Sequence, residues 1–472
     1  MNADANGRNA HATVMRRIEC TVDLLRLHEL NPQRYPHLLQ SATPGPQAGY
    51  DILFAFPENT LSLEASGNLI GDESGATVFL DALDARWRRE AYAHNDQDTQ
   101  LPFRGGWFVY LSYELAGQIE PRLRLPAPTI PTPIALATRF RSAVIRDHQE
   151  NCLWLVTEAG THERLDELAQ DIEQLIAQPD AGAAFDEPEL PELTLTEDAA
   201  DRYLAMVRRT LAYIRDGDIF QANLARTWTA RFTEVVAPSR LYRRLRTRNP
   251  GPFNGLATWP EHAIISSSPE RLVRVRGTHI DTRPIAGTRP RGQGAADDAA
   301  LSRELMAHPK ERAEHIMLID LERNDLGRVC VPGTVRVDEL MVLESYAHVH
   351  HIVSNVRGEL RAEITPGAVI RALFPGGTIT GCPKVRCMEI IAELEGAGAE
   401  GHGRGAYTGA IGYLNRDGDM DLNILIRTLE QHGETVELRA GAGIVADSDP
   451  ERELAETRAK ARGLLLALGV DA

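Results

Sequence analysis

The sequence predicts an α+β protein in which helices flank a large amount of antiparallel β-sheet. Three observations favour this class. Residues 17–145 mix short β-like runs, such as 51–56 and 107–115, with clusters of turn-forming residues. The segments 161–178 and 200–220 place apolar residues at helical spacing. After these segments, strand-like runs and glycine-containing motifs continue to the end of the chain.

The chain has 472 residues, which suits one large domain or two of medium size. We expect residues 1–16 to form a flexible leader, because they are polar and lack an apolar core. Residues 17–190 are expected to form an N-terminal region, and residues 191–472 a C-terminal region. At their junction, the acidic stretch 179–198 is rich in proline and alanine and is typical of a linker or a surface crossing.

The composition argues against several classes of protein. A net charge of −16 repels phosphate backbones, so we expect no nucleic-acid partner. No run of about 18 apolar residues occurs, so we expect no membrane span. The five cysteines are scattered without a C-x-x-C pair, which suits a reducing cytoplasm and argues against zinc. Lysine occurs only at Lys310, Lys384 and Lys460, all inside the motifs described below.

Two helix-like segments each carry two glutamates three residues apart, so that each pair shares one helix face. The pairs are Glu311 with Glu314, and Glu453 with Glu456. Pro309 marks the start of the first helix, while Asp449 can cap the second and Pro450 takes its first position. Four carboxylates on two helices could converge on a hard cation such as Mg²⁺, which prefers oxygen ligands. Taken alone, each pair is more typical of a solvated helix face than of a metal site.

Glycine stands where a strand meets a turn in three segments: 283–292, 374–384 and 439–445. Glycine there permits positive φ and close approach of a ligand to the backbone, whose free N–H groups can hold a carboxylate. A phosphate-binding loop is ruled out, because Cys382 and Pro383 replace its Lys and Ser/Thr. The HVHH run at 348–351 has no HExxH pattern, so we expect at most one functional histidine there.

Taken together, the motifs resemble, in sequence and in order, those of the chorismate-utilising enzymes. They are GDIFQANLAR (217–226), SSSPERLV (266–273), RPIAGTRPRG (283–292), ERAEHIMLIDLERNDLGRV (311–329), HVHHIVS (348–354), FPGGTITGCPKVRCMEII (374–391), YTGAIGY (407–413), DMDLNILIRTL (419–429) and AGAGIVADSDPERELAETRAK (440–460). The resemblance implies an α/β sandwich of two large antiparallel sheets flanked by helices, like that of anthranilate synthase component I. It makes 191–472 the chorismate-binding catalytic region, interleaved with the N-terminal part.

The resemblance also implies a role for each matching residue. Glu314 and Glu456 would bind Mg²⁺ directly, and Glu311 and Glu453 would bind it through water, so that the ion holds the ring carboxylate of chorismate. His351 would act as a general acid near the leaving C4 hydroxyl, and Glu311, Thr378 and Gln221 complete the expected catalytic set. The expected substrate-binding set is Tyr413, Arg427, Gly441, Ala442, Gly443, Lys460, Gly377, Ala286, Gly287 and Thr288.

Three positions bear on the reaction within this family. Gln221 stands where the isochorismate and salicylate synthases carry a lysine that activates water, so ammonia is the expected nucleophile. Ala286 matches anthranilate synthases, whereas some aminodeoxychorismate synthases carry a lysine there that attacks the ring. The FPGGTITG motif favours the aminodeoxychorismate branch. So does Gln40, which stands in place of a tryptophan-sensing glutamate. The resemblance thus implies Mg²⁺-dependent amination of chorismate to 4-amino-4-deoxychorismate, with anthranilate synthesis as the alternative.

The expected partners follow from the same comparison. None of the five cysteines lies in the strand–turn–helix elbow of a glutaminase, so a separate glutaminase subunit should supply ammonia. A tryptophan pocket in the N-terminal region would involve Leu39, Gln40 and Ser41. A non-catalytic member of the family should lack His351 or one of the paired glutamates, and all five residues are present.

Overall fold

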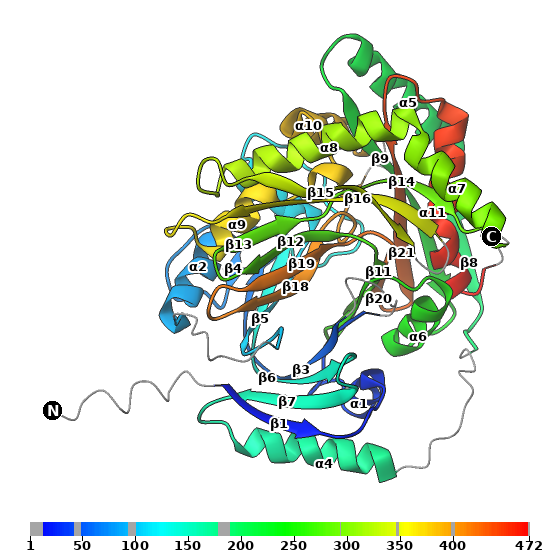
Figure 1. Ribbon diagram of the computed structural model, residues 1–472. Coiled ribbons are helices and arrows are strands. Elements are labelled where there is room, and N and C mark those ends of the chain that lie inside the picture. Colours follow the sequence, from blue (N-terminus) through cyan, green and yellow to red (C-terminus); the bar gives the residue numbers. More distant parts are fainter. Residues whose placement is uncertain are drawn as a thin grey trace.

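The computed structural model describes residues 13–41, 49–92, 101–177, 189–292, 294–345, 349–397 and 402–470. Within these residues the strands form one continuous antiparallel network, and the helices lie outside it (Figure 1). The predicted α+β class is therefore confirmed.

The helices and strands have the following bounds. The helices are α1 (Leu24–Leu30), α2 (Phe79–Glu90), η1 (Tyr113–Leu115), α3 (Ala116–Ile119), α4 (Glu163–Ala177), α5 (Ala200–Arg215), α6 (Pro238–Arg248), α7 (Ala295–Ala307), α8 (Pro309–Gly327), α9 (Pro366–Leu373), η2 (Gly377–Ile379), α10 (Lys384–Glu395) and α11 (Pro450–Ala467). The strands are β1 (Thr13–Ile18), β2 (His37–Gln40), β3 (Tyr50–Leu63), β4 (Leu69–Ile70), β5 (Gly106–Leu111), β6 (Ala135–Asp147), β7 (Cys152–Glu158), β8 (Leu193–Glu197), β9 (Gln221–Phe232), β10 (Phe253–Thr258), β11 (His262–Ser268), β12 (Arg271–Arg276), β13 (His279–Thr282), β14 (Ile285–Pro290), β15 (Arg336–Ser345), β16 (Val349–Glu359), β17 (Gly381–Cys382), β18 (Ala410–Asn415), β19 (Met420–Ile424), β20 (Thr428–His432) and β21 (Thr435–Ile444).

The long paired strands β3 and β6 join two arms of the network. One arm runs from β5 through β18, β19, β12 and β13 to β16, which also pairs with β14 and β15. The other runs from β2 through β10, β11, β20 and β21 to β9. Apolar side chains from both arms share one core between them, including Phe54, Phe108, Ile264 and Ile411. The two arms therefore pack as a sandwich, as expected for this resemblance.

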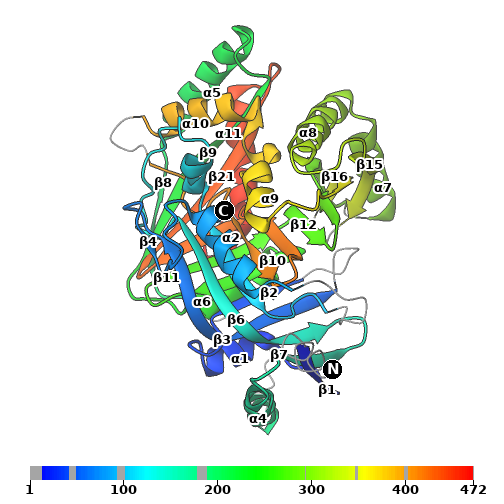
Figure 2. The same ribbon diagram turned by 90° about the vertical axis from the view of Figure 1, so that its left-hand side faces the viewer.

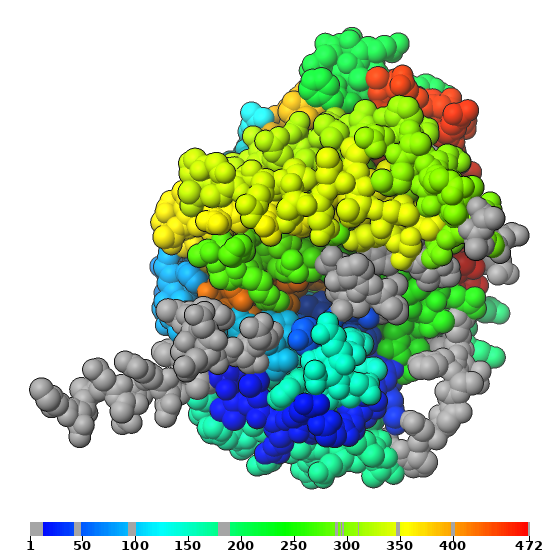
Figure 3. All heavy atoms as spheres, viewed as in Figure 1, coloured from blue at the N-terminus to red at the C-terminus, as the bar shows by residue number. Residues whose placement is uncertain are grey.

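Helices cover the outer faces of both arms. Residues of α5 and α10 pack on β9 and β21, whereas residues of α2, α8 and α9 pack on the arm that contains β12 and β19. In Figure 2, α5, α10 and α11 lie on one side and α7 and α8 on the other. Figure 3 shows yellow and green residues of the C-terminal half above the blue and cyan N-terminal strands.

The two helices that carry the glutamate pairs begin where the sequence predicts. Pro309 opens α8, and a ring nitrogen of His308 accepts from the Glu311 N–H at 3.5 Å. Asp449 caps α11 by accepting from the Arg452 N–H at 3.0 Å, with Pro450 at the first position. Both glutamate pairs therefore lie in the first two turns of their helices.

The regions of the chain interleave. Strands β2 and β5 of the N-terminal region pair with β10 and β18 of the C-terminal region. The leader expected for residues 1–16 ends earlier, because Thr13 already begins β1, which pairs with β7; residues 1–12 lie outside the described part. In the expected linker, Leu193–Glu197 forms β8 beside β9, and residues 178–188 are not described. Among the described helices, none has the length and apolar character needed to cross a membrane.

Candidate active site

The glycine-rich end of β21 runs beside the start of β9. Gly441 pairs in register with Ala225, and Gly443 pairs with Asn223. From β9, the Gln221 amide reaches past Gly443 and donates to Glu314 Oε1 on α8 at 2.9 Å. This contact brings one predicted metal ligand directly to the glycine strand.

Helix α11 also contacts strand β21. Lys460 Nζ donates to the Gly441 carbonyl at 2.9 Å and lies 2.7 Å from Glu456 Oε1, one turn earlier on the helix. In an antiparallel strand the N–H and C=O of one residue point the same way. The N–H groups of Gly441 and Gly443 therefore face α11, beyond the point where β20 stops pairing with β21. Free N–H groups and a lysine suit a carboxylate.

Arg427 places a second cation at this edge. Its backbone φ is +53°, a strained conformation for a residue other than glycine, and such strain of order 1–3 kcal/mol concentrates at functional sites. Its Nη1 donates to the Lys460 carbonyl at 2.8 Å, and it forms no ion pair with any described residue. Burial lowers the pKa of Arg427, while Tyr407 and Glu456 raise it. A half-buried guanidinium that forms no ion pair with a described carboxylate is suited to bind one from a ligand.

Strands β14 and β16 bring the PIAGT and HVHH motifs together. Thr288 pairs in register with His351, and Ala286 pairs with Ile352; the side chain of Thr288 lies outside the described part. Gly287 forms the bulge between these pairs with φ +71°, and a Cβ there would stand 2.9 Å from Glu311 Oε2. The positive φ therefore favours glycine at this position.

His351 is buried, and burial together with the nearby Arg427 lowers its pKa to about 4. The imidazole is therefore neutral at pH 7. A neutral imidazole is a poor proton donor, which argues against the general-acid role expected for His351 and leaves it able to hydrogen-bond or accept a proton.

A buried glutamate that the sequence analysis missed is better suited to donate a proton. Glu270, in the turn between β11 and β12, is next to Thr378 of η2 and to the backbone of Ile285. Burial and the charge of Glu322 raise its pKa to about 8, so Glu270 holds a proton at neutral pH. The neighbouring Gly377 N–H donates to Glu322 Oε1 at 3.3 Å. The η2 turn thus contacts two buried acids.

The two tyrosines of YTGAIGY point to different places. The hydroxyl of Tyr407 lies against Gly441, 2.6 Å from where a Cβ would stand, and burial raises its pKa to about 12. Tyr413, expected to bind substrate, instead accepts a hydrogen bond from Arg276 at 2.7 Å and lines a separate cavity. The structure therefore replaces Tyr413 by Tyr407 in the candidate site, because Tyr407 precedes β18 whereas Tyr413 lies within it.

Two buried polar atoms beside the glycine strand make no hydrogen bond within the described residues: Gln221 Oε1 and Asn223 Oδ1. The η2 turn reaches β9 because the Asn223 N–H donates to the Thr380 carbonyl at 2.9 Å. Buried polar atoms are normally satisfied, so unpaired ones that face one region indicate a polar ligand there.

The glutamate pairs offer the oxygen donors that Mg²⁺ prefers, but they are not gathered into a cluster. No group of three or more His, Cys, Asp or Glu side chains able to hold a metal is found among the described residues. Glu314 accepts a hydrogen bond from Gln221, and Glu456 forms an ion pair with Lys460. Glu453 interacts electrostatically with Tyr203. The glutamate carboxylates are donors of the kind that Mg²⁺ binds. The contact that competes most directly with a bound cation is the ion pair of Lys460 with Glu456.

The predicted tryptophan pocket corresponds to a cavity of about 290 Å³. Leu39, Gln40 and Ser41 line it together with Tyr413. Gln40 is held by the protein: its Nε2 donates to Asp51 at 3.1 Å and its Oε1 accepts from Tyr242 at 2.9 Å. An amide held in this way is a weaker partner for a ligand's ammonium group than a free carboxylate.

A buried ion pair holds the site segments in place. Arg404 donates to both oxygens of Glu395 at 2.9 and 2.7 Å, and to the carbonyls of Asn223 and Ile379. We expect Arg404→Met to lower the free energy of unfolding by about 3–5 kcal/mol, because Glu395 would be left buried and unpaired. Urea denaturation measures this loss.

The matched control is Arg16→Met, which removes an exposed pair with Asp166 and should cost less than about 1 kcal/mol. Equal losses in the two variants would contradict the structural role of Arg404.

Comparison with known proteins agrees with this geometry. A family model described as chorismate binding enzyme matches residues 39–466. The chain is 46% identical over 369 residues to an anthranilate synthase component I-like protein of Synechocystis sp., covering 78% of this chain and 73% of that protein. It is 42% identical over 370 residues to aminodeoxychorismate synthase component 1 of Bacillus subtilis, covering 78% and 77%. The crystal structure of anthranilate synthase component I from Streptococcus pneumoniae TIGR4 superposes with a TM-score of 0.76 at 32% identity, covering 89% and 93%.

Proposed function

The chain belongs to the family of chorismate-binding enzymes, and from this premise we propose that it aminates chorismate to 4-amino-4-deoxychorismate with ammonia and Mg²⁺. The observation that carries the proposal is the edge of β21, where Arg427, Lys460 and two glycine N–H groups meet beside a buried protonated acid. This combination suits a substrate with two carboxylates and a hydroxyl leaving group.

The cations and N–H groups would hold the substrate carboxylates. Arg427 can bind a carboxylate through two parallel hydrogen bonds, whereas Lys460 supplies a point charge. The Tyr407 hydroxyl, placed against Gly441, can donate to the same ligand. Because these groups come from β21, α11 and the segments beside β18 and β20, the substrate would be fixed in one orientation.

Gln221 supports ammonia as the nucleophile. A carboxamide has no basic nitrogen and cannot take a proton from water, but its free Oε1 can accept a hydrogen bond from ammonia. Ammonia needs no base to become a nucleophile, so an uncharged acceptor is sufficient for orienting it.

Glu270 supports loss of the C4 hydroxyl. Ammonia attacks the ring, and the C4 oxygen leaves as water after taking the Glu270 proton. The C–N bond forms, the C–O bond breaks, Glu270 becomes a carboxylate, and the nitrogen keeps its third proton, so that the product leaves as an ammonium. We assign His351, neutral and buried, to hydrogen bonding rather than to acid catalysis.

Mg²⁺ would be held by Glu314 and Glu456, with Glu311 and Glu453 as outer partners, and would supply positive charge to the ring carboxylate. For Glu456 to serve, Lys460 must leave it. Lys460 can then form an ion pair with the second carboxylate of the substrate. A separate glutaminase would deliver the ammonia.

Anthranilate synthesis is the second candidate, and Ala286 is the observation that favours it. Ala286 is buried in β14, and no lysine stands there to attack the ring. Both candidates share binding and loss of the C4 hydroxyl, and they differ in the carbon that receives ammonia and in whether pyruvate leaves.

Product analysis distinguishes the candidates. The purified chain is incubated with chorismate, Mg²⁺ and ammonium, with and without aminodeoxychorismate lyase, and the products are separated by mass. The proposal requires 4-aminobenzoate only when the lyase is present. Anthranilate without lyase would favour the second candidate, and unchanged chorismate would refute both.

The two tyrosines give a sharper test of the site. We expect Tyr407→Phe to raise KM for chorismate about 2- to 10-fold, since one hydrogen bond is worth about 0.5–1.5 kcal/mol. Tyr413→Phe serves as the matched control and should leave KM unchanged, because that hydroxyl faces the other cavity. Steady-state kinetics measures both, and the reverse ranking would show that the original assignment of Tyr413 is correct.

A further inference from the structure

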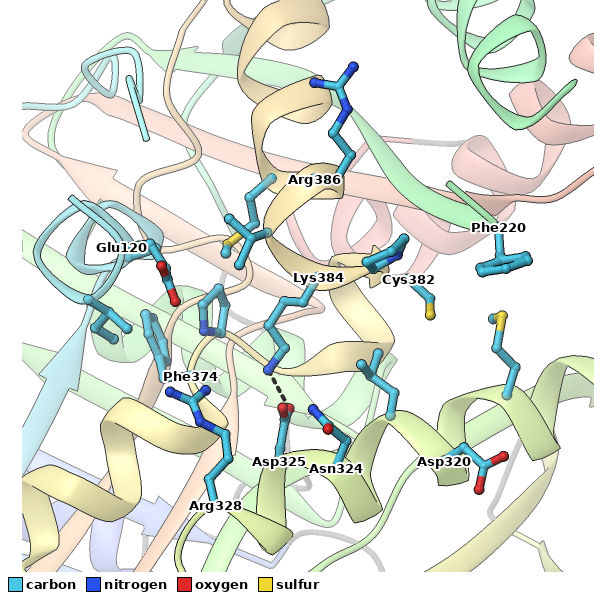
Figure 4. Close-up of a pocket in the computed structure, with 18 of the residues that line it drawn as sticks. Glu120, Phe220, Asp320, Asn324, Asp325, Arg328, Phe374, Cys382, Lys384 and Arg386 are labelled. Atoms are coloured by element: carbon cyan, nitrogen blue, oxygen red, sulfur yellow. Dashed lines mark hydrogen bonds and ion pairs between the residues drawn. The ribbon is translucent and has the colours of Figure 1, made fainter. Parts of the chain in front are cut away.

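A large cavity lies beside α8. Its volume is about 930 Å³, and residues of α3, α8 and α10 line it. Figure 4 shows Lys384 of α10 meeting Asp325 of α8 at its wall. Lys384 Nζ donates to Asp325 Oδ2 and to the Leu373 carbonyl, the latter at 3.2 Å. Asp325 itself is buried, so this ion pair stands between the cavity and the interior.

One helical turn before Asp325, Glu322 points further inward. It is buried, with the Gly377 N–H at 3.3 Å and the Thr282 hydroxyl beside it. Burial, together with the charge of Asp325, raises the pKa of Glu322 to about 7, while Lys384 lowers it. A carboxyl with this pKa gains and loses a proton readily at neutral pH.

Glu270 completes a line of three buried acids. Glu322 contacts Gly377, Glu270 lies beside Thr378, the next residue, and the two acids interact electrostatically. The charged groups that face the line are Lys384 near Asp325 and Glu322, Arg328 near Asp325, and Lys460 near Glu270. Only Lys384 forms an ion pair with any of the three acids among the described residues. Ionising all three buried carboxyls beside one paired cation is unfavourable, which favours protons on these acids.

We propose that Asp325 and Glu322 relay protons between water in the cavity beside α8 and Glu270. The inference rests on the proposed function, in which each turnover removes one proton from Glu270. The Glu270 carboxylate takes a proton from Glu322, Glu322 takes one through Asp325, and cavity water supplies it. The acid is then restored from the side of α8, by a route that does not pass the substrate-binding edge of β21.

The key variant is Glu322→Gln, which keeps the shape of the side chain but cannot carry a proton. In single-turnover kinetics with chorismate and ammonium, the rate should stay within about twofold, because Glu270 starts protonated. In steady state the rate should fall about tenfold or more, with a larger solvent deuterium isotope effect. Glu322→Asp should restore most of the loss. Glu120→Gln, which changes an acid elsewhere in the same cavity, should have no effect.

A second measurement does not depend on turnover. The infrared C=O stretch of protonated carboxyls shifts when the proton exchanges for deuterium. In the unsubstituted protein, the Glu270 band should shift rapidly in D₂O, and Glu322→Gln should slow that shift. Equal slowing of single and multiple turnovers, or unchanged exchange in Glu322→Gln, would overturn the relay. A parent protein that leaves chorismate untouched but shows slowed exchange in the variant would refute only the proposed function.

Discussion

Glu270→Gln is expected to lower kcat for chorismate amination about 10²- to 10⁴-fold, the usual worth of a positioned proton donor. The amide keeps the size of the side chain and its position beside Thr378 but cannot release a proton to the leaving hydroxyl. KM should change little, because Glu270 is assigned to the transition state rather than to substrate binding.

The pH dependence gives the sign of the effect. Glu270 acts as an acid only while protonated, so its contribution is present below its pKa of about 8 and is lost as the pH rises through that value. With free ammonia held constant, the parent activity should fall on the alkaline side, and Glu270→Gln should lose that limb. Glu437→Gln, another buried glutamate with a raised pKa, is the matched control and should behave as the parent. A variant at position 270 that keeps full activity would return the acid role to His351.

Much of the fold could be predicted from local signals in the sequence. Pro309, Asp449 and Pro450 mark the starts of α8 and α11, because helix caps depend on only a few adjacent residues. The helical periodicity at 161–178 likewise corresponds to α4. The pairing of β5 with β18 depends on contacts about three hundred residues apart, for which a single sequence carries no local signal.

The site was less predictable, for a physical reason. Glu270 and Glu322 are important because they are buried, whereas a glutamate read from sequence is by default a solvated residue. Their partners Thr378 and Gly377 meet them only in the folded chain. Tyr407 and Tyr413 are six residues apart in one motif. Their surroundings differ because Tyr407 lies before β18, next to Gly441, whereas Tyr413 lies within it, next to Arg276. Alternation along a strand cannot place a residue that lies outside the strand.

Glu314→Gln should cause a comparable loss of activity through the metal. A divalent ion that stabilises transition-state charge is worth several kcal/mol, and a loss of about 4 kcal/mol corresponds to about a thousandfold in rate. Because the amide keeps the hydrogen bond with Gln221 possible, the fold should be retained while the anionic donor is lost. EDTA should abolish the parent activity, and Mg²⁺ should restore it.

A metal-binding measurement distinguishes loss of the bound ion from a change in the fold. Mn²⁺ titration followed by electron paramagnetic resonance should show an ion bound to the parent protein with chorismate and a much weaker one in Glu314→Gln. Asp320→Asn is the matched control, since this residue is exposed on the same helix and, among the residues that the structure describes, pairs only with Arg323. If activity survives EDTA, or if Glu314→Gln binds Mn²⁺ as the parent does, the paired glutamates are not the metal site. In that case the Lys460–Glu456 ion pair would be the functional state of α11 rather than a contact that the metal must displace.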